Sequence, residues 1–520
     1  SSAGEKRMWA ISIALAIATI AWFEWGSVSS SASGVHANVD DKSIAVLPFS
    51  DLSAEGDQVY FGDGMAEEIL NLLAKNPELR VAGRTSSFKF RGEETDLRNI
   101  GDALNVAHVL EGSVRKAGLQ VRVTAQLIDT ESGFHLWSET YDTELDNIFD
   151  VQDRISASIV EALEATIGGD TKTSRAAPTD NLDAYSLYLR AKPLVVARGK
   201  ANLASAIHLL ESALLLDPEF NEAKETLAFA YGISMYWGSD IDRDARFARA
   251  RELNDQALAA NPDSPRAWLS DAVYRIFYGG DWNGMRESLV RAYAINPRLP
   301  DTANFIGDYY RITGNVEKAI QYEGLAVDLD PLSAVNHHDY ADALLIGGRL
   351  DDAVAEYERG LELDETLDVR TTGVLLYLTR KDFARARLNA EWNARQYGEN
   401  AAVYLRDYEA QKTLMWGTLD DLREHVPVLE ADLGKIENPF AVIVDVYLAL
   451  GECDKASEVM QKYDITSRVN LRSPYSIVGA GQCPNSESWQ QLWSEPSLKL
   501  LSELRAENGI HDHNLLRRVP

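Results

Sequence analysis

Three adjacent residues form the densest group of catalytic-type side chains in this sequence: His337, His338 and Asp339. Histidine and aspartate take part in acid–base catalysis and in metal binding. Neighbouring residues on a helix point about 100° apart, so the two imidazoles do not easily share one ligand. We therefore interpret the three residues as part of a helix surface.

The sequence signatures of several large enzyme classes are missing. No G-x-x-x-x-G-K-[ST] phosphate loop, no H-E-x-x-H zinc helix and no G-x-S-x-G nucleophile turn occurs. We predict no catalytic residue, no cofactor and no metal site, and hence a chain that is not an enzyme.

Two short motifs have residues that could contact an anion: Gly62-Asp63-Gly64 and Arg84-Thr85-Ser86-Ser87. A glycine-flanked helix N-terminus binds anions through its free N–H groups. Asp63 would occupy that position itself, and Glu67 and Glu68 follow in the first turn. These motifs therefore predict helix capping rather than ligand binding.

The chain has two cysteines, Cys453 and Cys483, and no C-x-x-C pair, so no zinc site is expected. They would form a disulfide in an oxidising compartment. Two unrelated thiols are the alternative.

The acidic balance of the chain restricts its partners. With 51 basic and 80 acidic residues, the net charge is −29. Such a surface repels a phosphate backbone, so we predict that this chain binds no nucleic acid and mildly favours basic partners.

The N-terminal segment resembles a membrane anchor. Residues 8–23 carry no charge, Lys6 and Arg7 precede them, and tryptophans border the run. This pattern predicts a membrane helix over residues 1–26 and a flexible linker over 27–40. A cleaved secretory signal is the alternative. The positive-inside rule then predicts a single-pass inner-membrane protein with the bulk of the chain in the periplasm. The chain begins at Ser1 rather than at a methionine, which leaves open whether a cytoplasmic output domain precedes it.

Residues 41–170 have the pattern of a small α/β domain. The apolar run Ile44–Leu47 ends at Pro48 and predicts a buried strand. Residues 109–114 and 121–127 flank a turn at Gly118, and apolar residues alternate along the second segment, which predicts a hairpin with one buried face. The full pattern predicts the order β-α-β-α-β-β-β-α.

Several strings in this region resemble a known family. SIAVLPFSDLS, YFGDGMAEEILNLLAK, VAGRTSSFKFRG, VLEGSVRKAG, VRVTAQLID and HLWSETYD are similar to the TolB-type N-terminal domain, over residues 42–160. The resemblance implies a bacterial signalling protein in which this domain lies just outside a membrane helix and precedes tetratricopeptide repeats. The resemblance extends to winged-helix regulators and class III adenylate or guanylate cyclases that have this domain and these repeats in their C-terminal half. Their output domain lies upstream of the membrane helix.

A repeat follows a linker at residues 171–182. Asp217-Pro218, Asn261-Pro262, Asn296-Pro297 and Asp330-Pro331 recur at intervals of 44, 35 and 34 residues. Small residues and turn glycines keep the same phase, which resembles the 34-residue tetratricopeptide repeat. We predict tetratricopeptide repeats over 183–400, then irregular helical repeats and a C-terminal cap over 401–520. The predicted fold class is α+β: a transmembrane helix, a small α/β sandwich and a mostly α-helical tetratricopeptide superhelix.

The first helix of each such repeat lines the concave face of the superhelix, which predicts a partner-binding groove. The residues assigned to it are Ser270, Tyr274, Phe277, Asp301, Asn304, Asp308, Arg311, His338 and Asp342. Aspartates beside aromatic residues suit a basic or extended peptide segment of a protein partner.

We therefore predict a non-enzymatic scaffold or sensor half of a membrane-anchored bacterial signalling protein. The alternatives are the C-terminal regulatory part of an adenylate or guanylate cyclase whose catalytic domain lies upstream, and an envelope assembly factor.

Overall fold

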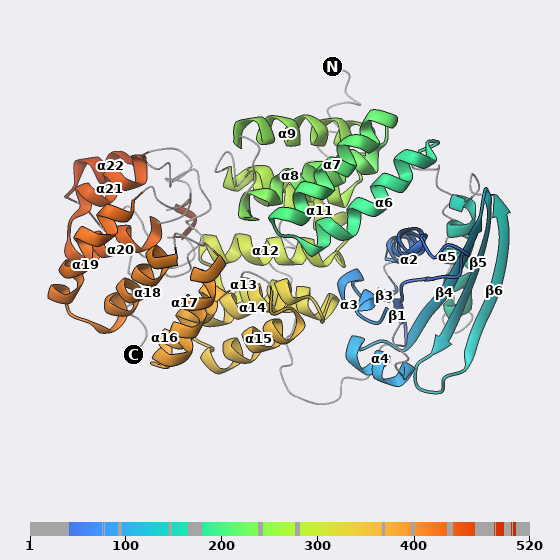
Figure 1. The fold of residues 1–520 in the computed structure, drawn as a ribbon, viewed down its shortest axis with the longest axis horizontal. Coiled ribbons are helices and arrows are strands. Elements are labelled where there is room, and N and C mark those ends of the chain that lie inside the picture. Colours follow the sequence, from blue (N-terminus) through green and yellow to red (C-terminus); the bar gives the residue numbers. More distant parts are fainter. Residues whose placement is uncertain are drawn as a thin grey trace, which may run out of the picture.

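The computed structural model places a small sheet domain against a long array of helices (Figure 1). The residues that it describes are 41–74, 76, 78–91, 96–144, 148–164, 179–237, 243–275, 281–366, 370–396, 401–433, 440–462 and parts of 483–505.

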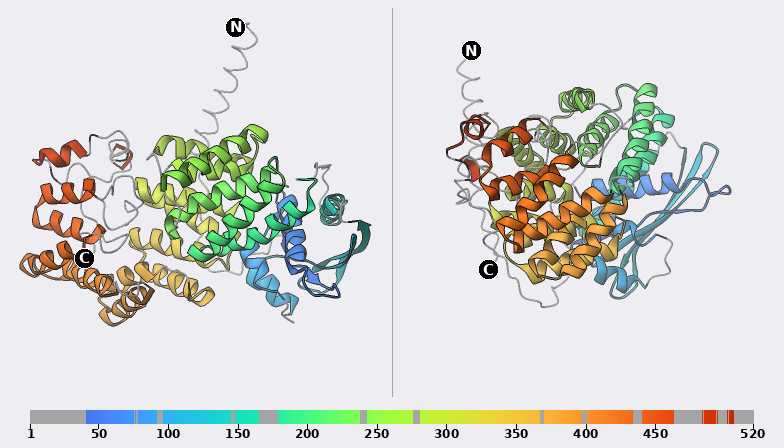
Figure 2. Two further views of the ribbon diagram at one scale, coloured as in Figure 1. Left: turned by 45° about the horizontal axis from the view of Figure 1, so that its top comes forward. Right: turned by 60° about the vertical axis from the view of Figure 1, so that its left-hand side comes forward.

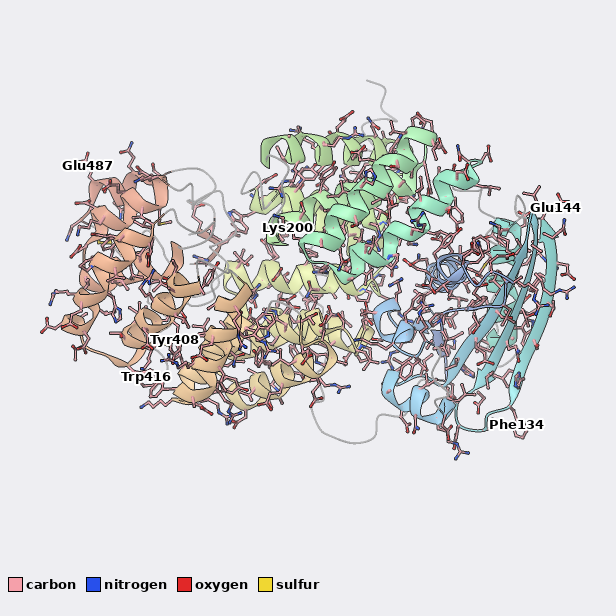
Figure 3. The ribbon with its side chains drawn as sticks, viewed as in Figure 1. Phe134, Glu144, Lys200, Tyr408, Trp416 and Glu487 are labelled. Carbon is pink, nitrogen blue, oxygen red and sulfur yellow. A yellow bond between two sulfur atoms is a disulfide. The ribbon has the colours of Figure 1, made fainter. Side chains whose placement is uncertain are left out.

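The sheet has the order β3-β1-β4-β5-β6, with a short β2 beside β4. Strand β1 pairs in parallel with both β3 and β4, and β4, β5 and β6 are antiparallel. The strands are β1 (Ser43–Val46), β2 (Ser50–Asp51), β3 (Arg80–Val81), β4 (His108–Ala117), β5 (Gln120–Asp129) and β6 (His135–Glu144). Phe134 and Glu144 lie at the two ends of the edge strand β6 (Figure 3).

Side-chain alternation divides the core of this domain between the two faces of the sheet. Ile44 and Val46 of β1 pack with α2 (Val59–Leu73) and α5 (Ile148–Glu164). Ala45 of the same strand packs on the other face, with α4 (Leu97–Leu104). The period of two along an extended strand explains this division, and the alternating residues of β5 are buried in the same way.

The helices after residue 180 form eight hairpins in the part of the chain that the structure describes, followed by one short helix. Their bounds are α6 (Leu182–Ala197), α7 (Lys200–Leu216), α8 (Asn221–Trp237), α9 (Arg243–Ala260), α10 (Pro265–Tyr274), α11 (Trp282–Ile295), α12 (Pro300–Thr313), α13 (Val316–Leu329), α14 (Ala334–Ile346), α15 (Leu350–Leu363), α16 (Arg370–Thr379), α17 (Phe383–Gln396), α18 (Ala401–Trp416), α19 (Leu419–Asp432), α20 (Phe440–Leu450), α21 (Cys453–Lys462) and α22 (Glu487–Leu492).

Local sequence explains where these helices begin and end. Asn315 and Ser333 accept backbone N–H groups as N-caps of α13 and α14. Gly314 and Gly348 adopt φ of 92° and 74° in the turns inside two hairpins, a conformation that glycine takes without strain. The chain therefore contains tetratricopeptide-like hairpins, as the period predicts.

The sheet domain docks directly on the array. On one side, Glu67 and Glu68 of α2 form ion pairs of 3.0 and 2.8 Å with Lys192 of α6. On the other side, Asp330, in the turn between α13 and α14, accepts the backbone N–H of Ser86 at 2.7 Å and so caps the short helix α3 (Arg84–Phe88). Figure 2 shows the array extending away from this contact.

Two candidate anion motifs lie in or beside this contact. The helix α2 begins at Val59, four residues before Asp63, so the prediction that Asp63 caps the helix is wrong. Asp63 instead forms an ion pair of 2.5 Å with Arg91. A methyl group on Gly64 would meet Leu189 of α6 at 2.5 Å, which shows how closely α2 and α6 approach.

The membrane prediction requires correction. None of the helices within the described residues is long and apolar enough to cross a bilayer. The apolar α20 has 11 residues, or about 16 Å at 1.5 Å per residue, against a hydrocarbon core of about 30 Å. The predicted anchor over 1–26 falls outside the described residues. In place of an α+β fold with a transmembrane helix, the described chain is mostly helical with one small sheet. The single-pass inner-membrane location with a periplasmic bulk is not supported.

The C-terminal helices return to the middle of the array. Arg505, which is buried, donates from Nε to the carbonyl of Ile312 at the end of α12, at 2.9 Å. Cys453 and Cys483 form a disulfide with a Cα–Cα distance of 6.0 Å. Cys483 and Leu501 share one apolar cluster with Trp282 and Ile312.

Candidate functional site

The structure places eight of the nine predicted groove residues on first helices of three hairpins. Ser270 and Tyr274 lie on α10, and His338 and Asp342 lie on α14. The four from α12 are Asp301, Asn304, Asp308 and Arg311. Phe277 falls outside the described residues.

Most of these side chains are buried rather than open to a groove. Asn304 and Asp308 are 2% and 3% exposed, and Ser270 is 2% exposed. Side chains of neighbouring helices cover them, as where Glu323 of α13 accepts from Asn304 at 3.1 Å. In this conformation the predicted groove residues contact one another, and their binding to a partner stays a prediction.

The nine residues do not form one site. Tyr274 belongs to a separate network around Asp271, which also holds Arg275 and Ser288. Asp301 lies at the start of α12 and pairs with basic residues at 3.5 and 4.0 Å, Arg198 and Arg266.

Five of the groove residues, Asn304, Asp308, Arg311, His338 and Asp342, meet in a polar cluster, which we call the α12–α14 cluster. Its members are Asn304, Asp308, Arg311, Glu323, His338, Asp339, Asp342 and Thr372. They come from α12, α13, α14 and α16, three of which are first helices. Sequence reasoning missed Glu323 and Thr372, because nothing in the period shows which second-helix or next-repeat side chains reach the first helices.

Hydrogen bonds connect the cluster continuously. Asn304 donates through Nδ2 to both Glu323 Oε2 and Asp339 Oδ2, at 3.1 and 2.8 Å. His338 contacts Asp339 Oδ1 through Nδ1 at 3.1 Å and Thr372 Oγ1 through Nε2 at 2.6 Å. The Thr372 hydroxyl donates in turn to Asp342 Oδ1 at 2.9 Å.

Burial and neighbouring charges shift the pKa values of residues in the cluster. Burial raises the pKa of Asp308 to about 6 despite its ion pair with Arg311. Burial also raises the pKa of Glu323 well above its usual range, and the negative charges of the nearby Asp339 and Asp308 raise it further. Burial alone would lower the pKa of His338, but the carboxylates of Asp339 and Asp342 offset this and raise it.

The neighbouring histidine is separate from this cluster. His337 contacts Glu356 Oε2 through Nδ1 at 2.5 Å and the Pro331 carbonyl through Nε2 at 2.8 Å. His337 and His338 therefore have different partners, as their angular separation on a helix predicts.

Comparisons with known proteins find partial relatives. No model of a known protein family matches the chain. A protein of Rhizobium meliloti (strain 1021) named "Putative adenylate cyclase 3" is 34% identical over 235 residues, which is 44% of this chain and 40% of that protein. The chain thus spans about two fifths of this relative's length.

Similar solved structures are helical repeat proteins. A tetratricopeptide protein of Thermus thermophilus has a TM-score of 0.31 and 21% identity, and covers 39% of this chain and 99% of its own. One from Parabacteroides merdae has a TM-score of 0.30 and 13% identity, over 62% and 99% of the two chains. Human IFIT1, solved with m7Gppp-AAAA, has a TM-score of 0.36 and 14% identity, over 61% and 78%. These likenesses concern the fold alone.

Proposed function

We propose that this chain is a non-enzymatic interaction scaffold that serves as the sensor or regulatory part of a bacterial signalling protein. The observation that carries this proposal is the stacking of first helices: α12, α14, α16 and α18 contact each other in succession. Each hairpin buries its apolar face against the next, and such arrays present an extended surface to a partner.

The partner that suits this surface is a basic or extended protein segment. The net charge of −29 favours it, and His338 and Asp339 keep side-chain exposures of 17% and 18% at the edge of the α12–α14 cluster. We further propose that the sheet domain is the TolB-type unit that residues 42–160 resemble. The sheet domain forms ion pairs with α6, and Asp330 of the array caps its helix α3. These contacts support the proposal that the sheet domain relays a binding event on the helical array.

A charge-introduction experiment tests the scaffold proposal. The full chain is used as bait beside a Thr371→Arg/Ala402→Arg variant, which adds positive charge at exposed positions of the first helices α16 and α18. The control, Glu362→Arg/Leu388→Arg, adds charge at exposed positions of the second helices α15 and α17.

The expected result is a discrete protein that the wild type and the control recover and that the first-helix variant loses. Its purified form should then bind the wild type with an affinity that falls as salt rises. Equal recovery by both variants would contradict the first-helix surface, and no recovery by the wild type would contradict the scaffold.

The relative from Rhizobium meliloti favours a second candidate, the regulatory part of an adenylate cyclase. The coding sequence upstream of Ser1 distinguishes the two candidates. If it contains a cyclase domain, cyclic-nucleotide production by the complete protein should change when the array is removed. Unchanged production would exclude a regulatory role for the array.

A further inference from the structure

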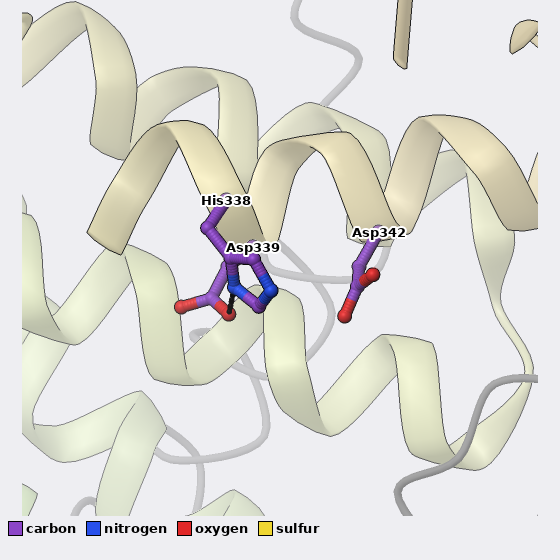
Figure 4. Close-up of side chains that lie close together, drawn as sticks. All are labelled: His338, Asp339 and Asp342. Atoms are coloured by element: carbon purple, nitrogen blue, oxygen red, sulfur yellow. Dashed lines mark hydrogen bonds and ion pairs between the residues drawn. The ribbon is translucent and has the colours of Figure 1, made fainter. Parts of the chain in front are cut away.

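His338 and Asp342 lie one helical turn apart on α14 and point the same way (Figure 4). Residues at positions i and i+4 share one face of a helix, a spacing that brings two ligands to a single metal ion. Ligand atoms of His338, Asp339 and Asp342 all lie within 4.8 Å of one another.

The imidazole of His338 has the orientation that metal-binding histidines usually have. Its Nδ1 is 3.1 Å from the Asp339 carboxylate, which holds the ring and directs Nε2 away from Asp339. Metal-ligating histidines almost always contact a carboxylate or a carbonyl through the other ring nitrogen, and this contact raises the basicity of the ligating nitrogen.

The ligating atoms converge on the Thr372 hydroxyl. His338 Nε2 lies 2.6 Å from Thr372 Oγ1, which donates to Asp342 Oδ1 at 2.9 Å. Arg311 approaches the other carboxylate oxygen of Asp342, Oδ2, at 4.0 Å. Oδ1, which accepts from Thr372, is therefore not the oxygen paired with the guanidinium, so a cation could join Nε2 and Oδ1 without displacing Arg311.

A buried carboxylate oxygen without a hydrogen-bond partner in the described part of the chain lies in the same cluster, but it faces Gly307 of α12. Glu323 is 0% exposed, and its Oε1 has no hydrogen-bond partner among the described residues. Its Oε2 shares the Asn304 amide with Asp339, which directs the carboxylate from α13 into the cluster. Glu323 is therefore a neighbour of the candidate metal site and not one of its ligands.

Carboxylates also outnumber cations here. Asp308, Glu323, Asp339 and Asp342 lie in the cluster with two basic side chains, Arg311 and His338. Buried charges in proteins are either paired or coordinate metal ions.

We propose that the α12–α14 cluster binds one divalent transition-metal ion through His338 Nε2 and Asp342 Oδ1, with Asp339 as the residue that orients the imidazole. Imidazole combined with carboxylate suits Zn²⁺ or Mn²⁺, whereas Mg²⁺ and Ca²⁺ prefer oxygen ligands alone. The Thr372 hydroxyl lies beside the ion. Both ligands lie on α14 and Thr372 of α16 contacts both of them, so metal binding would stiffen the contact between α14 and α16.

The test uses the full, untagged chain after chelator treatment and dialysis. Calorimetric titration with ZnCl₂ and MnCl₂ should give about one equivalent of tight binding with either ion, and MgCl₂ and CaCl₂ should bind more weakly. The unfolding temperature should rise by several degrees at an ion concentration about 100-fold above Kd, because the ion binds the folded state.

Conservative variants locate the site. His338→Gln and Asp342→Asn should each lose at least about tenfold in affinity, and Asp339→Asn should lose about 10- to 100-fold, as expected for a residue that orients a ligand. The matched control is His511→Gln/His513→Gln, which removes a second pair of closely spaced histidines and should leave the affinity unchanged.

Two results would overturn the proposal: no binding by the wild type, or undiminished binding by His338→Gln. Circular dichroism of each metal-free variant establishes that it folds. If His338→Gln does not fold, proton NMR of the wild type with Co²⁺ tests the site instead. An imidazole bound to Co²⁺ gives hyperfine-shifted proton signals. Their loss in the His511→Gln/His513→Gln variant, or their absence in the wild type, would exclude the α12–α14 cluster.

Discussion

At the scale of single residues, buried charges join the sheet domain to the array. Lys192 forms ion pairs with Glu67 and Glu68, and Glu67 also pairs with Arg84 at 2.7 Å. Burial by itself would raise the pKa of Glu67, but Lys192 and Arg84 lower it to about 2. This carboxylate therefore favours the folded state above its ordinary pKa of 4.5, and that contribution is lost as pH falls from about 4.5 towards 2.

Removal of the shared cation should be strongly destabilising. Lys192→Met leaves two carboxylates in a buried interface without their partner, so we expect a loss of about 3–5 kcal/mol in the free energy of unfolding. Urea unfolding at pH 7 measures it. Arg122→Ala, which breaks the exposed pair with Asp142 at 2.6 Å, should have no measurable effect. Equal effects of the two variants would contradict a buried junction.

Asp407 of α18 should make stability fall as pH rises. Burial, with Asp432 nearby, raises its pKa from 3.8 to about 7. The folded state thus holds the proton more tightly than the unfolded state, and its stabilising contribution is present below pH 3.8 and lost as pH rises through about 7.

The corresponding variant is Asp407→Asn. We expect it to be about 1–3 kcal/mol more stable than the wild type at pH 8, and nearly equal to it at pH 4. Thermal unfolding at the two pH values measures the difference. Asp420→Asn, on the exposed side of α19, serves as the control. A pH-independent difference for Asp407→Asn would contradict the assignment.

At the scale of elements, close helix contacts distinguish two helical glycines. A methyl group on Gly64 would meet Leu189 Cδ1 at 2.5 Å, whereas one on Gly324 of α13 would meet Tyr340 at an ordinary 3.4 Å. A glycine inside a helix makes the helix less stable than an alanine does, by about 0.5–1 kcal/mol. Replacement of glycine by alanine is therefore unfavourable only where the added methyl group meets a neighbour.

The two alanine variants should therefore have opposite effects. Gly64→Ala should separate α2 from α6 and lower stability by about 1–3 kcal/mol, and Gly324→Ala should raise it by up to about 1 kcal/mol. Chemical denaturation measures both. Stabilisation by Gly64→Ala would show that the sheet domain does not dock closely on α6.

At the scale of the whole molecule, contacts between residues distant in sequence hold the C-terminal part of the chain in place. The disulfide closes a segment of 30 residues between Cys453 and Cys483, and Arg505 reaches the end of α12. The contact of Arg505 connects parts of the chain about 190 residues apart, so no local pattern encodes it.

Reduction of the disulfide should loosen this end alone. Because the chain has two cysteines, any effect of a reductant traces to this bond. We expect a loss of about 2–4 kcal/mol in local stability, seen as faster amide hydrogen exchange in α21 and α22 and unchanged exchange in α2 and β5. Unchanged exchange in α21 would contradict a stabilising role.

The local elements were largely predictable from the sequence. The recurring Asp-Pro and glycine positions predict the hairpins α12–α13 and α14–α15, because caps and turns act within a few residues. Alternation along β5 predicts the hairpin with β4 for the same reason. The start of α2 was not predictable to the residue, since Gln58 caps it without a side-chain hydrogen bond.

The candidate site was predictable only in part. The phase of the repeat places Asn304, Asp308 and His338 on first helices, and their spacing is visible in the sequence. The burial of Asn304 and Asp308 is not, because it depends on side chains that come from other helices, such as Glu323 against Asn304. The fold class with a membrane helix and the inner-membrane location were the wrong predictions, since an apolar run predicts a span only from its composition.

The repeat period, the alternation of the sheet and the acidic surface all follow from the order of residues alone, because each depends on neighbours along the chain. Which charges are buried together depends instead on the packed molecule. His338 and Asp342 share a face of α14 by sequence, but Thr372 and Glu323 join them from other helices. Such a cluster depends on how hairpins stack, and stacking arises from contacts between residues that are distant in sequence.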